Sequence, residues 1–346
     1  MAQKTWLGTA NSAYTNTANW SEGSIPTTND TVTVASEAVR DITSGLDQSG
    51  VVISTFEVEE GFGYNIGTES SYLQIKLTGT GTNTFHYHGS GAMAKIDLNA
   101  SALAPIVFNT GNPSTGSWGL ALKGTALTGC VVHGGYVGMG VEPGDVTTDC
   151  DSFDVYPQKN RFTQLTIGKG VTGNSSDLNI TMGGGVVYNG AATGVVNCLG
   201  GEYHHTANEF DTGGFHGSSK LFVISPEASG GKTYAANGVE MFGQSKAEVR
   251  GGAGALTFTR VILHSGTTWD ERIFGVTYSN AIEVPDGLQG VTIILSTGMS
   301  TQKQVADAIA LLKDENLVVC HCNSTYPCST DDLNLRVISE MMTKMP

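Results

Sequence analysis

Charged residues are scarce in this sequence. Asp, Glu, Lys and Arg make up only 14% of the 346 residues, against roughly 25% in an average soluble domain. Long amphipathic helices carry such residues on their solvent side, so their scarcity argues against a mainly helical protein. The net charge is −14, which argues against a nucleic-acid-binding protein, because such proteins need a basic surface.

Long apolar runs are also absent. No stretch of about 18 apolar residues occurs, so we expect no membrane-spanning helix. The opening residues lack the apolar segment of a secretory signal, and the six cysteines are scattered along the chain rather than set in a disulfide framework. We therefore expect folding in a reducing cytoplasm. Cys130 and Cys198 stand in apolar runs and are predicted to be small core residues.

Standard catalytic motifs are missing too. The glycine pairs are not followed by the Lys-Ser/Thr of a phosphate-binding loop. A Gly-x-Ser-x-Gly nucleophile elbow does not occur either. These absences favour a structural role without a cofactor.

Glycine, in contrast, is abundant, with 46 residues. From about residue 119 to 265, short apolar runs each end in glycine, and their spacing is close to multiples of about 17 residues. Such a period predicts a solenoid with eight or nine turns in this tract, mainly β in class: a parallel β-helix or β-solenoid. The markers of this period are Gly134, Gly168, Gly184, Gly200 and Gly251.

The first thirty residues contain large aromatic side chains and turn residues ahead of the alternating strand 31–34. Tryptophans in this position can cover the open end of a stack of strands. The arrangement resembles the opening of parallel β-helix domains in bacterial surface proteins and tailed-bacteriophage structural proteins. The resemblance implies a β-helix and a homotrimer. The residues that carry it are Trp6, Asn19, Trp20, Gly23, Pro26 and Asp30.

The last fifty-odd residues differ in pattern from the rest. A strand at 291–295, a helix from Ser300 or Thr301 to about Asp314, a strand at 317–320 and a second helix opening at Ser329 predict a small α/β segment. The predicted organisation is a Trp-rich cap with the first strands at 1–50, a β-solenoid body at 51–290 and the α/β segment at 291–346. The Met-rich last helix is a candidate docking or trimerisation element.

The densest group of ionisable residues lies between residues 202 and 216. A glycan-cleaving site needs two carboxylates, and Glu202, Glu209 and Asp211 are the candidates. A metal site would use His204 or His205 with Glu209 and His216. Adjacent histidines in a strand point to opposite faces, so both cannot serve one site. A polar surface loop without a site is the competing interpretation.

Two further clusters have both a metal interpretation and a structural one. An acidic run could hold a hard cation such as Ca²⁺, although its spacing does not match a calcium loop and a solvated loop explains it as well. On the predicted strand 85–88, His86 and His88 share one face, but no third ligand stands close in sequence. The acidic residues are Glu142, Asp145, Asp149, Asp151 and Asp154.

Soft ligands gather near the C-terminus, where Cys320, His321, Cys322 and Cys328 are weak candidates for zinc. The paired Cys-x-x-Cys spacing is absent, so a Cys322–Cys328 disulfide or free thiols remain alternatives.

The leading functional hypothesis is a non-catalytic structural protein of a tailed-bacteriophage virion, a capsid decoration or head-projection protein. Its expected partners are further copies of itself and the major capsid protein or other virion proteins. It would be made in the host cytoplasm and located in the virion, with no nucleic-acid or membrane partner. The alternative is a tailspike or other β-helix that binds or cleaves a host surface glycan. A bacterial surface adhesin is the third hypothesis.

Overall fold

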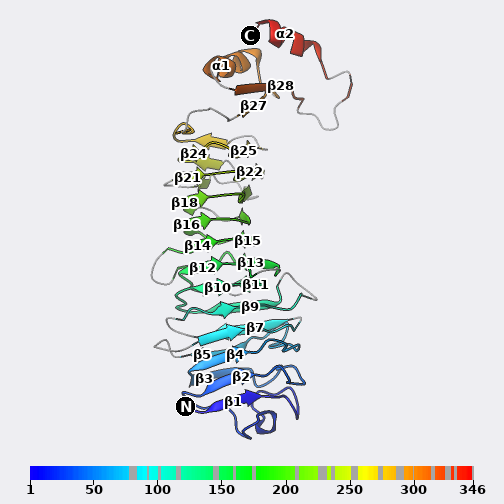
Figure 1. The fold of residues 1–346 in the computed structure, drawn as a ribbon, viewed down its shortest axis with the longest axis vertical. Coiled ribbons are helices and arrows are strands. Elements are labelled where there is room, and N and C mark those ends of the chain that lie inside the picture. Colours follow the sequence, from blue (N-terminus) through cyan, green and yellow to red (C-terminus); the bar gives the residue numbers. More distant parts are fainter. Residues whose placement is uncertain are drawn as a thin grey trace.

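The chain forms a long parallel β-solenoid of about 11 turns with a small α/β segment beyond its last turn (Figure 1). This architecture confirms the predicted fold class. The computed structural model describes residues 1–77, 84–91, 93–99, 103–113, 118–142, 148–158, 161–173, 177–206, 210–224, 232–234, 238–250, 256–271, 276–285, 292–298, 300–312, 316–323, 329–330 and 333–344.

Two long sheets run the length of the solenoid, and nearly every turn gives one strand to each of them. The 12-stranded sheet contains, in order, β1 (Gln3–Trp6), β2 (Thr31–Val34), β4 (Thr55–Val58), β6 (Thr84–Tyr87), β8 (Ile106–Val107), β10 (Cys130–Val132), β12 (Ser152–Val155), β14 (Asn179–Met182), β16 (Thr193–Cys198), β18 (Phe210–Phe215), β21 (Gly238–Met241) and β24 (Val261–Leu263).

The second sheet has 11 strands, and neighbouring strands pair in parallel in both sheets. From the N-terminal end it contains β3 (Asp47–Ile53), β5 (Leu73–Leu77), β7 (Ala94–Leu98), β9 (Leu120–Gly124), β11 (Gly135–Met139), β13 (Thr163–Ile167), β15 (Val186–Asn189), β17 (Glu202–His205), β19 (Lys220–Ile224), β22 (Lys246–Arg250) and β25 (Thr268–Glu271).

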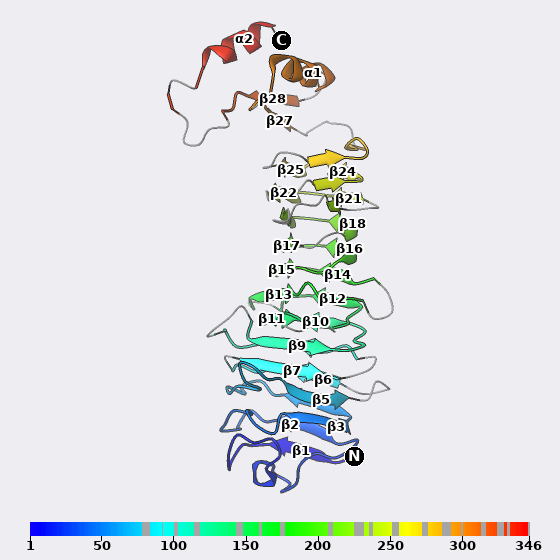
Figure 2. The same cartoon turned by 180° about the vertical axis from the view of Figure 1, so that it is seen from behind.

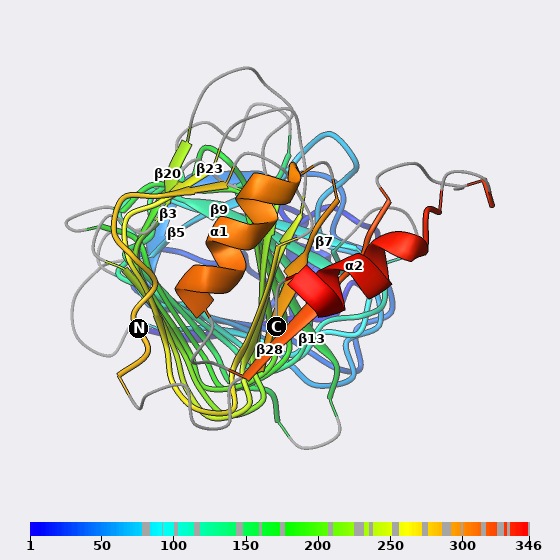
Figure 3. The ribbon, with the colours of Figure 1, turned by 90° about the horizontal axis from the view of Figure 1, so that it is seen from above.

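Near the C-terminal end of the solenoid a third face is formed by β20 (Lys232–Tyr234), β23 (Leu256–Phe258) and β26 (Val276–Tyr278). Figure 2 shows the solenoid from behind, and Figure 3, looking down its length, shows the strands of successive turns lying over one another. A 3₁₀ helix (Thr17–Asn19) lies in the N-terminal loop.

The core consists of side chains stacked in columns, because in-register parallel strands bring the same inward position of each turn together. One column continues through eleven turns, and Cys198 occupies it as a fully buried residue. Cys130 is fully buried in the next column, beside Phe153, so both cysteines are core residues as predicted. The column is Val34, Val58, Tyr87, Val107, Val132, Val155, Met182, Cys198, Phe215, Met241 and Leu263.

The predicted uniform period is wrong. Met182, Cys198 and Phe215 follow one another at nearly the predicted spacing, but the turn from Val155 to Met182, in the same tract, is more than half as long again. A loop at a corner of the solenoid lies on the surface, so its length can vary without disturbing the register of the strands. The solenoid also extends well beyond the tract in which the period was seen, since its parallel pairing begins at β1.

Aromatic side chains close both ends of the column stack. At the N-terminal end, Trp6 pairs in register with Val34 and packs with Tyr14 and Trp20, which confirms the predicted tryptophan cap. At the other end, Trp269 meets the edge of Phe258 at 5.1 Å between ring centroids and donates a hydrogen bond of 2.9 Å to the Tyr278 hydroxyl. The core is therefore covered at each end by packed aromatic rings.

The α/β segment contains β27 (Thr292–Ser296), α1 (Gln302–Leu312), β28 (Asn316–Cys320) and α2 (Arg336–Lys344). The strands pair in parallel. Of the two predicted caps, Ser300 and Thr301, it is Thr301 that caps α1: its hydroxyl accepts from the Gln304 N–H while the Gln304 side chain accepts from the Thr301 N–H. α2 begins at Arg336, later than the predicted opening at Ser329.

Candidate functional site

A row of nine residues, seven of them histidine or aromatic, runs along one corner of the solenoid. Each member is the residue directly after a strand of the 12-stranded sheet. Its N–H donates to the carbonyl of the last strand residue in the preceding turn, so nine successive turns keep one register. We call this row the corner stripe. Its members are His88, Phe108, His133, Tyr156, Gly183, Leu199, His216, Phe242 and His264.

Rings in the corner stripe stack on one another at close to the spacing of the turns. Phe242 lies between His216 and His264, with centroids 4.5 Å away on each side and nearly parallel planes. Phe108 lies between His88 and His133 at 5.4 and 5.6 Å. In the second triple both faces of Phe242 are occupied by its neighbours, whereas in the first the planes of Phe108 and His88 are tilted by 41°. Ring stacking of this kind stabilises the solenoid along its length.

Removing the central ring of the second triple tests this role. We expect Phe242→Ala to lower the free energy of unfolding by roughly 2–3 kcal/mol, because two ring contacts and the buried area of the phenyl group are lost together. Chemical denaturation measures the change. Leu199→Ala, a truncation of a half-exposed side chain in the same stripe, is the control, and an equal loss in both variants would show that stacking contributes nothing.

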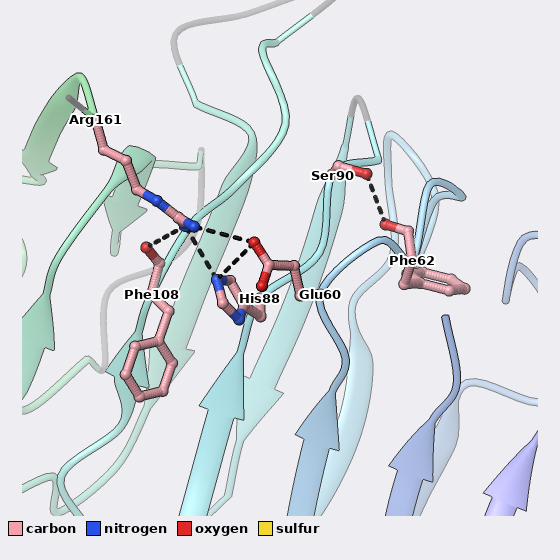
Figure 4. A network of polar contacts seen from close by, with 6 residues as sticks. All are labelled: Glu60, Phe62, His88, Ser90, Phe108 and Arg161. Atoms are coloured by element: carbon pink, nitrogen blue, oxygen red, sulfur yellow. Dashed lines mark hydrogen bonds and ion pairs between the residues drawn. The ribbon is translucent and has the colours of Figure 1, made fainter. Parts of the chain in front are cut away.

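A polar network stands at the N-terminal end of the corner stripe (Figure 4). Arg161 Nη1 donates to the Phe108 carbonyl at 3.1 Å and to His88 Nε2 at 3.0 Å, and Arg161 Nη2 donates to Glu60 Oε1 at 3.0 Å. In the same view Ser90 donates its hydroxyl to the Phe62 carbonyl at 3.2 Å. Arg161, in the loop after β12, therefore connects its own turn to the three earlier turns that contain Glu60, His88 and Phe108.

The network favours neutral His88. A guanidinium can only donate, so His88 Nε2 accepts and its proton lies on Nδ1. Burial lowers the pKa of His88, the Arg161 charge lowers it further, and the Glu60 carboxylate at 3.7 Å opposes both. Protonation of His88 would place a positive ring against Arg161.

This pKa shift predicts a pH dependence of stability. The folded pKa of His88 is below its unfolded value, so the unfolded state binds more protons and stability is lost as the pH falls through about 6.5. We expect the melting temperature of the His88→Gln variant to fall less between about pH 7 and pH 5 than that of the wild type. Gln can still accept from Arg161, so the two should melt alike near neutral pH. Equal slopes would contradict the prediction.

The predicted carboxylate group is spread over two sheets. Glu202 lies on β17 of the 11-stranded sheet and Asp211 on β18 of the 12-stranded sheet, so they are not on neighbouring strands. Glu209 lies outside the described residues. Glu202 accepts from Lys220 Nζ at 2.6 Å, and this hydrogen bond lowers the pKa of Glu202. An ionised carboxylate could serve as a base, a nucleophile or a binding group, but a general acid needs a raised pKa.

The two adjacent histidines point to opposite sides of β17, as predicted. His205 is fully buried in an inward column, where its Nδ1 lies 2.9 Å from the Tyr203 hydroxyl. His204 faces outward, 3.6 Å from Glu202, and burial lowers its pKa. His216 follows β18 in the corner stripe, so the predicted metal set of His204 or His205 with His216 is divided between two sheets.

The outward face of β15, β17 and β19 carries a second ring stack. His204 lies between Tyr188 and Phe222, with centroids at 4.6 and 4.4 Å. The guanidinium of Arg250 lies over Phe222 at 4.9 Å from the ring centroid. Tyr188 is 40% exposed, and Glu202 stands beside the stack, so this face combines an exposed ring with a carboxylate.

The acidic run of residues 142 to 154 is dispersed. Glu142 pairs with the buried Lys95 at 2.8 Å, and Asp149 accepts from the Thr172 hydroxyl at 2.7 Å. Asp154 faces outward on β12, and burial raises its pKa. Asp145 lies outside the described residues. Among the residues whose positions are described, no three His, Cys, Asp or Glu side chains are close enough to hold a metal ion.

The C-terminal soft ligands follow β28. His321 Nε2 lies 2.8 Å from the Leu333 carbonyl, and the Cys320 carbonyl accepts from Thr297 at 3.1 Å. Cys322 is a free cysteine among the described residues, and Cys328 lies outside them. His321 is thus occupied in joining the end of β28 to the segment before α2.

A small hollow beneath the N-terminal cap has a volume of about 10 Å³ and is lined by Tyr14, Pro26, Gln48, Val51, Ile53 and Ile75. That is room for about one water molecule. None of the described helices is long and apolar enough to cross a membrane.

Comparison with known proteins gives one finding. The model of the NeuB family matches residues 285–346, which contain the α/β segment and less than a fifth of the chain. No curated protein and no solved structure matches the chain.

Proposed function

We propose that this chain is a non-catalytic structural protein of a tailed-bacteriophage virion, a decoration or projection on the capsid that associates as a homotrimer. The observation that carries the proposal is the closed, continuous solenoid: its core columns run through eleven turns and aromatic rings cover both ends. Such a body is rigid and resists edge-to-edge aggregation. Its outer ring stacks join turn to turn.

Mass spectrometry of purified particles tests this proposal. A host lysate infected with the source phage would be fractionated on a density gradient, and peptides of this chain would be quantified against the major capsid protein. The proposal expects a fixed ratio between the two proteins across the particle peak. Peptides found only in the soluble fraction would overturn it.

A glycan-binding or glycan-cleaving β-helix is the second candidate, favoured by the face that holds Tyr188, His204, Phe222 and Glu202. An exposed ring can pack on a sugar, and an ionised carboxylate can accept hydrogen bonds from its hydroxyls. Incubation with host capsule or lipopolysaccharide distinguishes the two functions: new reducing ends that disappear in Glu202→Gln would replace the structural proposal.

The NeuB match suggests a different chemistry, because that family is sialic acid synthase-like. The match covers the α/β segment alone, so it supports no enzymatic proposal for the solenoid. It does indicate that residues 285–346 form a segment with its own pattern, distinct from the turns that precede it.

A further inference from the structure

Three successive turns of the 11-stranded sheet, those of β11, β13 and β15, present an uncharged outer face. The turn before this face carries Lys123 outward, and the turn after it carries Glu202. In a chain with a net charge of −14, such a face fits an uncharged ligand better than an ionic one. The outward positions of the three strands are Tyr136, Gly138, Gln164, Thr166, Val186 and Tyr188.

Aromatic rings gather on and beside this face. The ring centroids of Tyr136 and Phe162 are 4.9 Å apart, and Phe162 is 54% exposed. Trp118 precedes β9 and its indole lies over Gly138, because a Cβ atom on Gly138 would be 3.1 Å from Cγ and Cδ2 of the indole. Glycine at this position therefore lets the indole approach the sheet. Together with Tyr188, which is 40% exposed, these rings mark an interaction surface.

Trp118 and Tyr188 stand on either side of Thr166. The register of the strands places Gly138, Thr166 and Tyr188 in one outward column, one turn apart, and the Trp118 indole covers the first of these positions. Within the described part of the chain, His204 alone stacks on Tyr188, at 4.6 Å between centroids. The other face of Tyr188, on the side of Thr166, carries no ring.

The spacing of the turns indicates what fits between the two rings. Neighbouring parallel strands are about 4.8 Å apart, so the levels of Gly138 and Tyr188 are roughly 10 Å apart. Two contacts between carbon atoms take up about 7–8 Å of this distance. A flat aromatic ligand would be too thin by about 2 Å on this reckoning, whereas the puckered ring of a hexose can touch both sides. Its hydroxyls also match the Thr166 hydroxyl, which both donates and accepts.

We infer that Trp118 and Tyr188 bind an uncharged hexopyranose ring between them, with the Thr166 hydroxyl as its hydrogen-bond partner. The sugar lies on the side of Tyr188 away from His204, and its binding involves no covalent step. The inference takes its class of ligand from the glycan-binding candidate and gives that candidate a specific site. It does not depend on whether the protein belongs to a virion.

Surface plasmon resonance with the full chain tests the inference. The immobilised probes are linear oligosaccharides of uncharged hexoses and matched oligosaccharides that contain uronic acids. The wild type should bind an uncharged probe, and Trp118→Ala should weaken this binding at least roughly tenfold, because one of two ring contacts is lost. Thr166→Phe should weaken it as strongly by filling the position between the rings. A phenylalanine there continues the stacked column of Tyr188, His204 and Phe222, so this variant is expected to fold.

Thr181→Phe is the matched control, because it adds the same ring at an outward position of the 12-stranded sheet and should leave binding unchanged. A wild type that binds no uncharged probe, or only the acidic ones, overturns the inference, and so does wild-type affinity in Thr166→Phe. Melting temperatures show whether each variant is folded, and if Trp118→Ala is destabilised, Thr166→Phe decides. The particle experiment does not involve this site, so failure here would leave the virion proposal standing.

Discussion

Replacing Trp6 by alanine is expected to lower the free energy of unfolding by about 3–5 kcal/mol, the largest loss predicted here for one side chain. The Trp6 indole is fully buried. It stacks on Tyr14 at 6.1 Å between ring centroids and meets Trp20 edge to face at 5.5 Å. It also covers Val34, the first member of the longest core column, so its removal opens the end of the solenoid.

Hydrogen exchange of the backbone amides shows which strands lose stability in Trp6→Ala. Each turn of a solenoid contacts only its neighbours, so the effect should be largest in β1, β2 and β4 and should fade toward the middle of the shaft. Trp6→Phe is the matched control. The Trp6 Nε1 has no hydrogen-bond partner among the described residues, so phenylalanine loses contact area alone and should cost less. Unchanged protection of β2 in Trp6→Ala would show that the ring is not a cap.

The strands and the cap could be predicted because their signals are local. Alternating burial in β5 and β6 follows directly from alternating apolar residues, and aromatic residues before a first strand commonly cover it. The capping of α1 by Thr301 depends on residues three positions apart. Each of these features needs only a few neighbouring residues to be read.

Turn lengths could not be predicted, because the register of parallel strands is set by contacts between turns and not by the loops that join them. The Arg161–Glu60 ion pair, at 3.0 Å, joins residues of widely separated turns and has no local signal. The corner stripe did have one. In Tyr87-His88, Val107-Phe108, Val132-His133 and Met241-Phe242 a buried residue is followed at once by a ring, and this repeated pair marks the same corner in each turn.

The candidate site illustrates the same limit. Glu202 and Asp211 are near in sequence, yet a corner of the solenoid separates them and sends their strands to different sheets. Sequence proximity in a solenoid therefore says less about spatial proximity than equal position in successive turns does. Tyr188, His204 and Phe222 are neighbours for that second reason.

Gly168→Ala is expected to destabilise the protein by about 3 kcal/mol or more, through a clash with the main chain. A Cβ atom on Gly168 would lie 1.8 Å from the Gly140 carbonyl oxygen and 2.6 Å from its carbon. A side chain could rotate away from such a contact, but the backbone of the neighbouring turn cannot. The two turns would have to separate, which would break the hydrogen bond of 2.9 Å from the Gly168 N–H to the Met139 carbonyl.

Gly50→Ala is the matched control, because a Cβ there meets nothing within 4 Å. The same substitution at that exposed position should be neutral or stabilise by roughly 0.4–1 kcal/mol, since it restricts the unfolded chain. Denaturation curves should therefore show a large loss of stability for Gly168→Ala and none for Gly50→Ala. Equal stability would mean that neighbouring turns can move apart at little cost, and the shaft would then not be the rigid body on which the structural proposal depends.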